Sequence, residues 1–123
     1  MNKPDSIKID FERQKANGLL RVYDFIDNDH HVAFIPSLNL SAYAATREEA
    51  VKRLFETVVS DFFLCLTELP EYKASEELKK LGWSRGKILR KKFEQNTFVD
   101  RDGILKNFNL AEETVIHDEL VTV

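Results

Sequence analysis

The chain contains few residues of the kinds that cross-link a fold or bind phosphate. Its 123 residues include one cysteine, Cys65, four glycines and three prolines. A single cysteine excludes an intrachain disulfide framework. The glycines, at positions 18, 82, 86 and 103, are too scattered to build a phosphate-binding loop. The composition, 43% hydrophobic and 32% charged, is that of an ordinary globular domain.

Long hydrophobic runs are also missing. The most apolar stretch, from Val58 to Leu66, is interrupted by Ser60 and Asp61 and is too short to span a bilayer. The first ten residues, MNKPDSIKID, are polar and lack the apolar centre of a signal peptide. We therefore expect a cytoplasmic protein with no membrane partner.

Charge is distributed unevenly along the chain. Although the net charge is only −3, one segment from Lys79 to Lys92 holds seven bases and no acids, which leaves 11 bases against 21 acids elsewhere. Trp83 lies among these cations and Phe93 follows them, so the segment combines phosphate contacts with aromatic stacking and is a candidate nucleic-acid-binding site. The alternative is a solvated surface segment. The seven candidate residues are Lys79, Lys80, Arg85, Lys87, Arg90, Lys91 and Lys92.

Alternating apolar residues predict strands in the first part of the chain. Ile7, Ile9 and Phe11 alternate with charged residues, which is typical of a half-buried strand. Asn17-Gly18 predicts a tight hairpin turn, because both residues tolerate a positive φ. The polar stretch 27–30 predicts another turn. Further strands are predicted over 19–26, 31–35 and 38–43.

A helix is predicted from Arg47 to Thr67. Thr46 and Glu49 have the spacing of a capping box, in which each side chain bonds the other residue's backbone N–H. Apolar pairs recur every four residues, so the stripe drifts by about 40° per pair around the helix. The end near Phe62 and Leu66 therefore needs further cover, from the C-terminal third of the chain, a second copy or another partner.

The last third shows weaker patterns. We predict a short helix over 74–81 with Ser75 as its cap and Gly82 as its end, followed by Trp83 as a packed anchor. Residues 101–103 predict a turn, 104–110 one short helical turn, and 114–123 a strand. The predicted fold class is α+β, with an antiparallel meander of three to four strands packed on one long helix, a short C-terminal helix and an extra strand. The predicted units are residues 1–70 and a C-terminal extension, 71–123.

No constellation in the sequence predicts catalysis, a cofactor or a metal. His30 and His31 are adjacent, so in a strand they point to opposite faces. Cys65 has no base beside it and is interpreted as a small core residue. Four aspartates in strands and turns are the remaining candidates for a metal-dependent nuclease, although their spacing does not require them to converge. They are Asp10, Asp24, Asp27 and Asp29.

One stretch, from Phe25 to Glu56, carries a family resemblance. An acidic turn, 27–29, precedes an aromatic-x-Pro-x-Leu element formed by Phe34, Pro36 and Leu38, and a Thr-x-Glu-Glu-Ala helix start follows at 46–50. This order resembles the N-terminal domain of HicB-like antitoxins, and the string from Glu77 to Trp83 is similar to family members that continue past the helix. Ala44 replaces a usual Gly, Asn39-Leu40 replaces a usual Gly-Cys pair, and the DNA-binding C-terminal domain of many relatives is not recognisable.

The resemblance implies a partial RNase H-like fold without catalytic carboxylates. It also implies a binding protein that blocks the active site of a small basic ribonuclease toxin of the HicA-like kind, as a homodimer or higher oligomer; many relatives also repress their own operon. We therefore expect a protein that is not an enzyme. The alternatives are a nucleic-acid-binding regulatory module using segment 79–92, a metal-dependent nuclease, and an interaction domain of another kind.

Overall fold

The computed structural model describes residues 4–97 and 99–123. The predicted α+β class with an antiparallel sheet is confirmed, but the sheet has seven strands rather than three or four. The strands are β1 (Ser6–Asp10), β2 (Lys15–Asp27), β3 (His30–Ile35), β4 (Leu40–Ala44), β5 (Trp83–Arg85), β6 (Lys92–Gln95) and β7 (His117–Thr122). The helical segments are α1 (Arg47–Arg53), the π-helical η1 (Leu54–Val59), α2 (Ser60–Glu68), α3 (Glu71–Lys80) and α4 (Arg101–Asn107).

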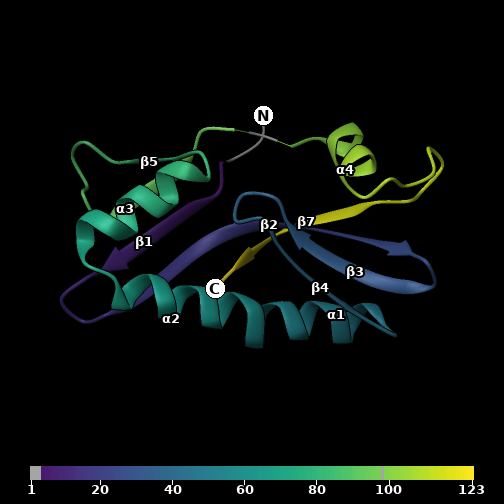
Figure 1. Ribbon diagram of the computed structural model, residues 1–123, viewed down its shortest axis with the longest axis horizontal. Coiled ribbons are helices and arrows are strands. Elements are labelled where there is room, and N and C mark those ends of the chain that lie inside the picture. The colour runs from purple at the N-terminus through teal and green to yellow at the C-terminus, as the bar shows by residue number, and fades with distance from the viewer. Residues whose placement is uncertain (1–3, 98) are drawn as a thin grey trace.

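The long strand β2 organises the sheet (Figure 1). Its first half pairs with β1, its second half pairs with β3, and β7 pairs with residues 19–24, overlapping both. Because a residue has one partner on each edge, β1 and β3 must share one edge of β2 and β7 must occupy the other. The shared edge is therefore split: near residues 20–22 neither β1 nor β3 covers β2. Beyond β1 the sheet continues through β6 to β5, and beyond β3 to β4.

The prediction of a turn at Asn17-Gly18 is wrong. Both residues lie within β2 and pair with Lys8 and Ile7, and the chain reverses earlier, through residues 11–14, where Gln14 has a φ of 53°. Gly18 is needed for a different reason: a Cβ there would lie 2.5 Å from the carbonyl oxygen of Ser6. The glycine therefore permits close approach of β1 rather than a reversal. The next predicted turn is present, with positive φ at Asn28 and Asp29.

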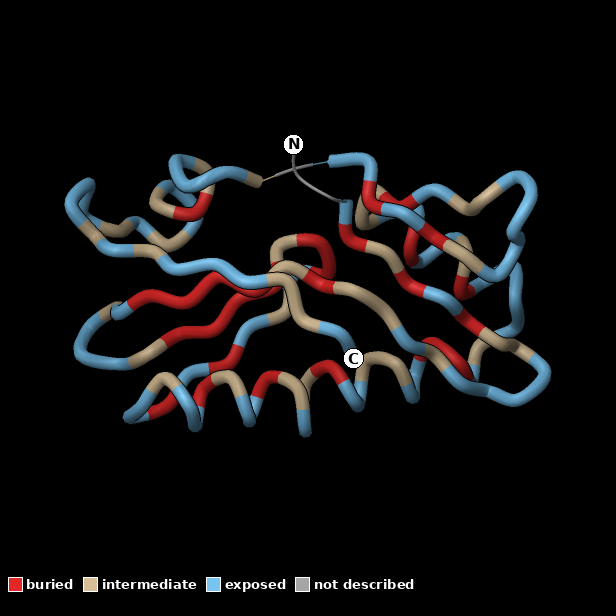
Figure 2. Tube along the Cα trace, turned by 180° about the vertical axis from the view of Figure 1, so that it is seen from behind, coloured by how far each residue is buried: buried red, intermediate tan, exposed pale blue. Residues whose placement is uncertain are grey.

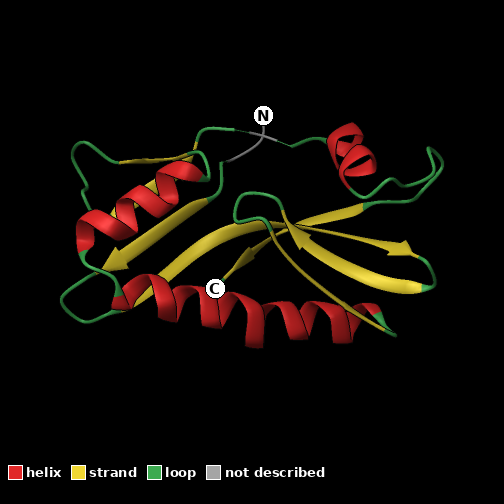
Figure 3. Ribbon diagram, in the orientation of Figure 1, coloured by secondary structure: helices red, strands yellow, loops and turns green. Residues whose placement is uncertain are grey.

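The helix predicted from Arg47 to Thr67 forms as one continuous run, α1–η1–α2, along one face of the strands (Figure 3). The N–H of Glu49 donates to the Thr46 hydroxyl at 3.2 Å, which is one half of the predicted capping box. The π-helical turn brings residues five apart onto one face, and Leu54 and Val59 are both buried. This wider turn compensates for the drift that an unbroken α-helix would impose on the apolar stripe.

Two apolar clusters lie on opposite faces of the sheet. The larger cluster joins the inner side of the long helix and α3 to residues such as Ile7, Leu20 and Ile35. The smaller one packs α4 against the other face, where Phe108 meets Phe25 and Phe34 edge-on. In Figure 2 the buried positions of the long helix face the strands and its exposed positions face outward. Within the described residues, no helix is both long and apolar enough to cross a membrane.

The C-terminal third forms more structure than its sequence pattern predicted. The helix α3 begins at Glu71 after Pro70, so Ser75 is inside the helix and is not its cap. Gly82 ends it with a φ of 93°, as predicted. Residues 101–103 are not an isolated turn, because they open α4, capped by the Asp100 carboxylate. The predicted strand over 114–123 appears as β7.

Candidate functional site

The predicted nucleic-acid-binding residues gather around one hairpin. Lys79 and Lys80 end α3, Arg85 ends β5, Lys92 opens β6, and the others lie in the loop between these strands. Four of the seven are engaged in ion pairs: Lys80 with Glu77, Arg85 with Glu71, Lys91 with Asp10 and Lys92 with Glu94. The positive charge of this segment is therefore partly neutralised by the chain itself.

Arg85 is a structural residue of this hairpin. Its guanidinium lies 5.7 Å from the ring centre of Phe11 and 5.5 Å from that of Phe93. It also donates to the Glu71 carboxylate at 2.9 Å and to the Arg90 carbonyl at 2.6 Å. A guanidinium suits such a position because it stacks and donates in one plane. The side chain ties α3 to the hairpin and has little surface left for a ligand.

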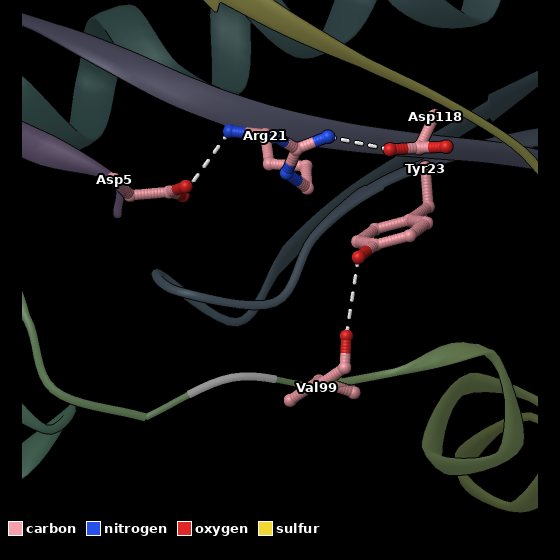
Figure 4. Close-up of polar contacts among 5 residues, drawn as sticks. All are labelled: Asp5, Arg21, Tyr23, Val99 and Asp118. Atoms are coloured by element: carbon pink, nitrogen blue, oxygen red, sulfur yellow. Dashed lines mark hydrogen bonds and ion pairs between the residues drawn. The ribbon is translucent and has the colours of Figure 1, made fainter. Parts of the chain in front are cut away.

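The best-defined cavity, of about 260 Å³, lies at the split edge of β2. Asp5, only 8% exposed, accepts hydrogen bonds there from the Arg21 N–H at 3.1 Å and the Ser37 hydroxyl at 2.6 Å (Figure 4 shows the first). The Asp5 carboxylate thus satisfies a backbone donor of β2 that neither β1 nor β3 reaches. Burial raises the pKa of Asp5, while the bonds from Ser37 and Arg21 lower it by less.

Other groups around this cavity also bond to one another. The Ser37 carbonyl accepts from the Trp83 indole at 2.8 Å and from the Gln95 amide at 3.1 Å. The Tyr23 hydroxyl donates to the Val99 carbonyl at 3.1 Å, and burial, with Asp118 nearby, raises the pKa of Tyr23 (Figure 4). These bonds join the two halves of the sheet across the split. We therefore interpret the cavity as a structural junction. Nothing in the sequence around Asp5 had indicated it.

The candidate metal and nucleophile residues do not converge. Asp24 pairs with Arg47 at 3.2 Å and Asp10 with Arg13 at 3.8 Å, and the pKa of Asp10 is lowered chiefly by the hydrogen bond from the Arg13 N–H. No group of three or more His, Cys, Asp or Glu side chains among the described residues has the geometry of a metal site. Cys65 is exposed, so its interpretation as a core residue is wrong.

The outer side of the long helix carries a second candidate surface. We call its five exposed acids the acidic helix face, and none of them forms an ion pair with any other residue the structure describes. Leu64, 58% exposed, lies on the same stripe, three residues after Asp61 and four residues before Glu68. The five residues are Glu48, Glu49, Glu56, Asp61 and Glu68.

Comparison with known proteins identifies no relative of this chain. No family model, no curated protein and no solved structure matches the chain significantly. The similarity to HicB-like antitoxins therefore rests on the residues between Phe25 and Glu56 and stays a prediction.

Proposed function

We propose that this chain is a cytoplasmic binding protein of the antitoxin type, which neutralises a small basic ribonuclease by covering its active site. The proposal includes a HicB-like, partial RNase H-like fold for β1 to β4 and the long helix. Support comes from two directions, the residue pattern between Phe25 and Glu56 and the charge of the helix beside it.

The acidic helix face is the observation that carries the proposal. Its carboxylates are exposed and form no ion pair with a described cation, whereas four cations of the basic segment are paired. The same helix also carries the exposed cations Lys52 and Arg53, so the surface is net acidic by five acids to two bases. A surface of net negative charge steers a positively charged partner and raises the association rate. Leu64 adds an apolar contact between Asp61 and Glu68, as expected for an interface in which a polar rim surrounds apolar residues.

A nucleic-acid-binding role for segment 79–92 is the second candidate. Three of its cations, Lys79, Lys87 and Arg90, form no ion pair with the described part of the chain, and all three are exposed. They supply fewer phosphate contacts than the seven cations of the sequence suggested. The acidic helix face would also repel a polyanion at longer range.

The test is a pull-down of the tagged chain from a lysate of its native organism, with and without nuclease, followed by mass spectrometry. We expect the chain to retain one small basic protein. A double variant, Glu56→Lys with Asp61→Lys, reverses charge on the acidic helix face and should weaken this retention by about tenfold or more, that is by at least about 1.4 kcal/mol.

The matched control is Glu112→Lys with Glu113→Lys, which makes the same charge change at exposed residues of the loop before β7. Retention that falls equally in both variants would mean that only net charge matters and would contradict a specific acidic interface. Retention of nucleic acid alone, lost on nuclease treatment, would favour the second candidate.

A further inference from the structure

The loop between β5 and β6 presents apolar side chains to solvent. Ile88 is 100% exposed and Leu89 is 50% exposed, at the tip of the hairpin. We call residues 87–90 the hairpin tip. Its apolar pair lies between the cations Lys87 and Arg90. The two side chains form a small apolar patch with a cation on each side, and apolar patches rimmed by polar residues are typical of interaction sites.

Several hydrogen bonds stabilise the hairpin tip. The Gly86 N–H donates to the Lys92 carbonyl at 2.7 Å, and the Lys92 N–H donates to the Leu89 carbonyl at 3.1 Å. The Arg85 side chain also donates to the Arg90 carbonyl, at 2.6 Å. A Cβ at position 86 would lie 2.5 Å from the Leu89 carbonyl oxygen, so only glycine allows this compact loop. Such a preorganised tip loses little conformational entropy when it binds.

An apolar groove lies between α2 and α3. Its volume is about 450 Å³, which is within the size range of ordinary binding pockets, and its apolar lining is Phe62, Cys65, Leu66 and Leu69. It lies where the sequence predicted that the end of the long helix needs cover. The structure leaves Phe62 half-buried and Cys65 exposed, so α3 covers this end only in part.

Charge distinguishes the hairpin tip from the groove. On the α3 side, Glu76 and Glu77 are balanced by Lys73 and by Lys80, which pairs with Glu77. On the α2 side, the exposed acids Asp61 and Glu68 lie four and three residues from Cys65 and have no cation beside them in α2. The rim of the groove is therefore net acidic, whereas the hairpin tip is basic. Both lie at the same end of the molecule, beside α3 (Figure 1).

We infer that the chain forms a two-fold dimer in which the hairpin tip of each copy inserts Ile88 and Leu89 into the α2–α3 groove of the other. Because donor and acceptor surfaces lie at one end of the molecule, two reciprocal contacts close a symmetric pair. The cations of the tip then face the acids of the groove. This dimer does not depend on the proposed antitoxin function. Because Asp61 and Glu68 belong both to the acidic helix face and to the rim of the groove, the test of the dimer changes the hairpin tip and leaves these acids intact.

A second copy fits this surface better than a nucleic acid or an anionic membrane. The most exposed side chain of the tip is aliphatic, and aliphatic side chains offer no ring on which a base can stack. The groove supplies an apolar cavity and opposite charge together, on the same molecule. A membrane would accept the tip but leave the groove uncovered.

The first measurement is the mass in solution by sedimentation equilibrium. We expect the wild-type chain to approach twice its 14.3 kDa as concentration rises, and Ile88→Asp to stay monomeric with unchanged circular dichroism. The control is Val115→Asp, since Val115 is 67% exposed and lies outside both surfaces. A monomeric wild type at all concentrations, or an Ile88→Asp variant that still dimerises, would overturn the inference.

The second measurement uses the single native cysteine, which lies in the groove. In Ile88→Cys, mild oxidation with diamide should link Cys65 of one copy to the new cysteine of the other, because a disulfide forms only when the two Cα atoms lie within about 7 Å. We expect at least tenfold faster covalent dimer formation than in Val115→Cys. Equal rates in the two variants, or a dimer that persists after Cys65→Ser, would contradict the tip-in-groove arrangement.

Loss of lipid-vesicle or RNA retention in Ile88→Asp, together with a monomeric wild type, would assign the hairpin tip to those partners instead.

Discussion

Asp5 connects three segments at the split edge of the sheet. Its carboxylate accepts from Arg21 of β2 and from Ser37 after β3, while its carbonyl accepts from the Gln95 N–H of β6 at 3.0 Å. A buried acceptor with two donors is costly to remove, since each donor left without a partner costs about 1–3 kcal/mol. The residue is therefore important for the fold whatever the chain binds.

Asp5 makes the stability depend on acid pH. Because burial raises its pKa above the ordinary 3.8, the folded state binds a proton more readily than the unfolded chain. The contribution of Asp5 is most favourable below pH 3.8 and is lost as pH rises through the higher folded pKa. We expect the free energy of unfolding of the wild type to fall across this window relative to Asp5→Asn, whose amide oxygen accepts the same two hydrogen bonds. Urea unfolding at closely spaced pH values measures this, and parallel curves for the two proteins would contradict the assignment.

Single residues also show where sequence reasoning fails. Asn17-Gly18 has the local signature of a turn, but a close approach between strands requires glycine equally well, and only the pairing with β1 distinguishes the two. The apolar stripe of an unbroken α-helix includes Cys65 and predicts its burial, whereas the π-helical turn rotates the last part of the helix and leaves Cys65 exposed. The first error comes from a tertiary contact that no local window contains, and the second from a change of helix type that the apolar spacing does not specify.

At the scale of elements, the long helix was predictable because its signals are local. Thr46 caps it, and its apolar spacing extends over many residues. The sequence does not predict the strands β5 and β6, because they are only three and four residues long. In addition, β6 pairs with β1, about 85 residues earlier in the chain, and no local pattern shows such a partner. The ion pair between Lys91 and Asp10 was unpredictable for the same reason.

The hairpin of β5 and β6 depends on Arg85. Arg85→Lys keeps the charge but removes the planar guanidinium that lies against the rings of Phe11 and Phe93. It also removes the simultaneous hydrogen bonds to the Glu71 carboxylate and the Arg90 carbonyl. A hydrogen bond to a charged group contributes about 1.5–3 kcal/mol, so we expect amide hydrogen exchange at Gly86 and Lys92 to accelerate by about tenfold or more.

The control for this change is Arg90→Lys, because only the backbone carbonyl of Arg90 takes part in the hairpin contacts described above. Its amide exchange should match the wild type. Unchanged protection in Arg85→Lys would show that the backbone bonds hold the loop without the guanidinium.

Across the whole molecule, charge and apolar surface are arranged at different places. The cations of segment 79–92 surround one hairpin and are partly neutralised, whereas the acids of the long helix are exposed along its outer side. The sequence predicted the two charge classes but not which of them stays unpaired, since that depends on partners distant in the chain. This difference is the reason why we propose a basic partner rather than a polyanion.

The most direct measurement of the proposed function is RNA cleavage by the small basic protein captured from the lysate, with increasing amounts of this chain. We expect cleavage to stop when the chain reaches an equimolar amount, and to resume as salt rises to about 1 M, where the Debye length shrinks to about 3 Å and the acidic helix face no longer attracts the partner. Cleavage that continues at full rate while the two proteins remain bound would contradict neutralisation by active-site occlusion.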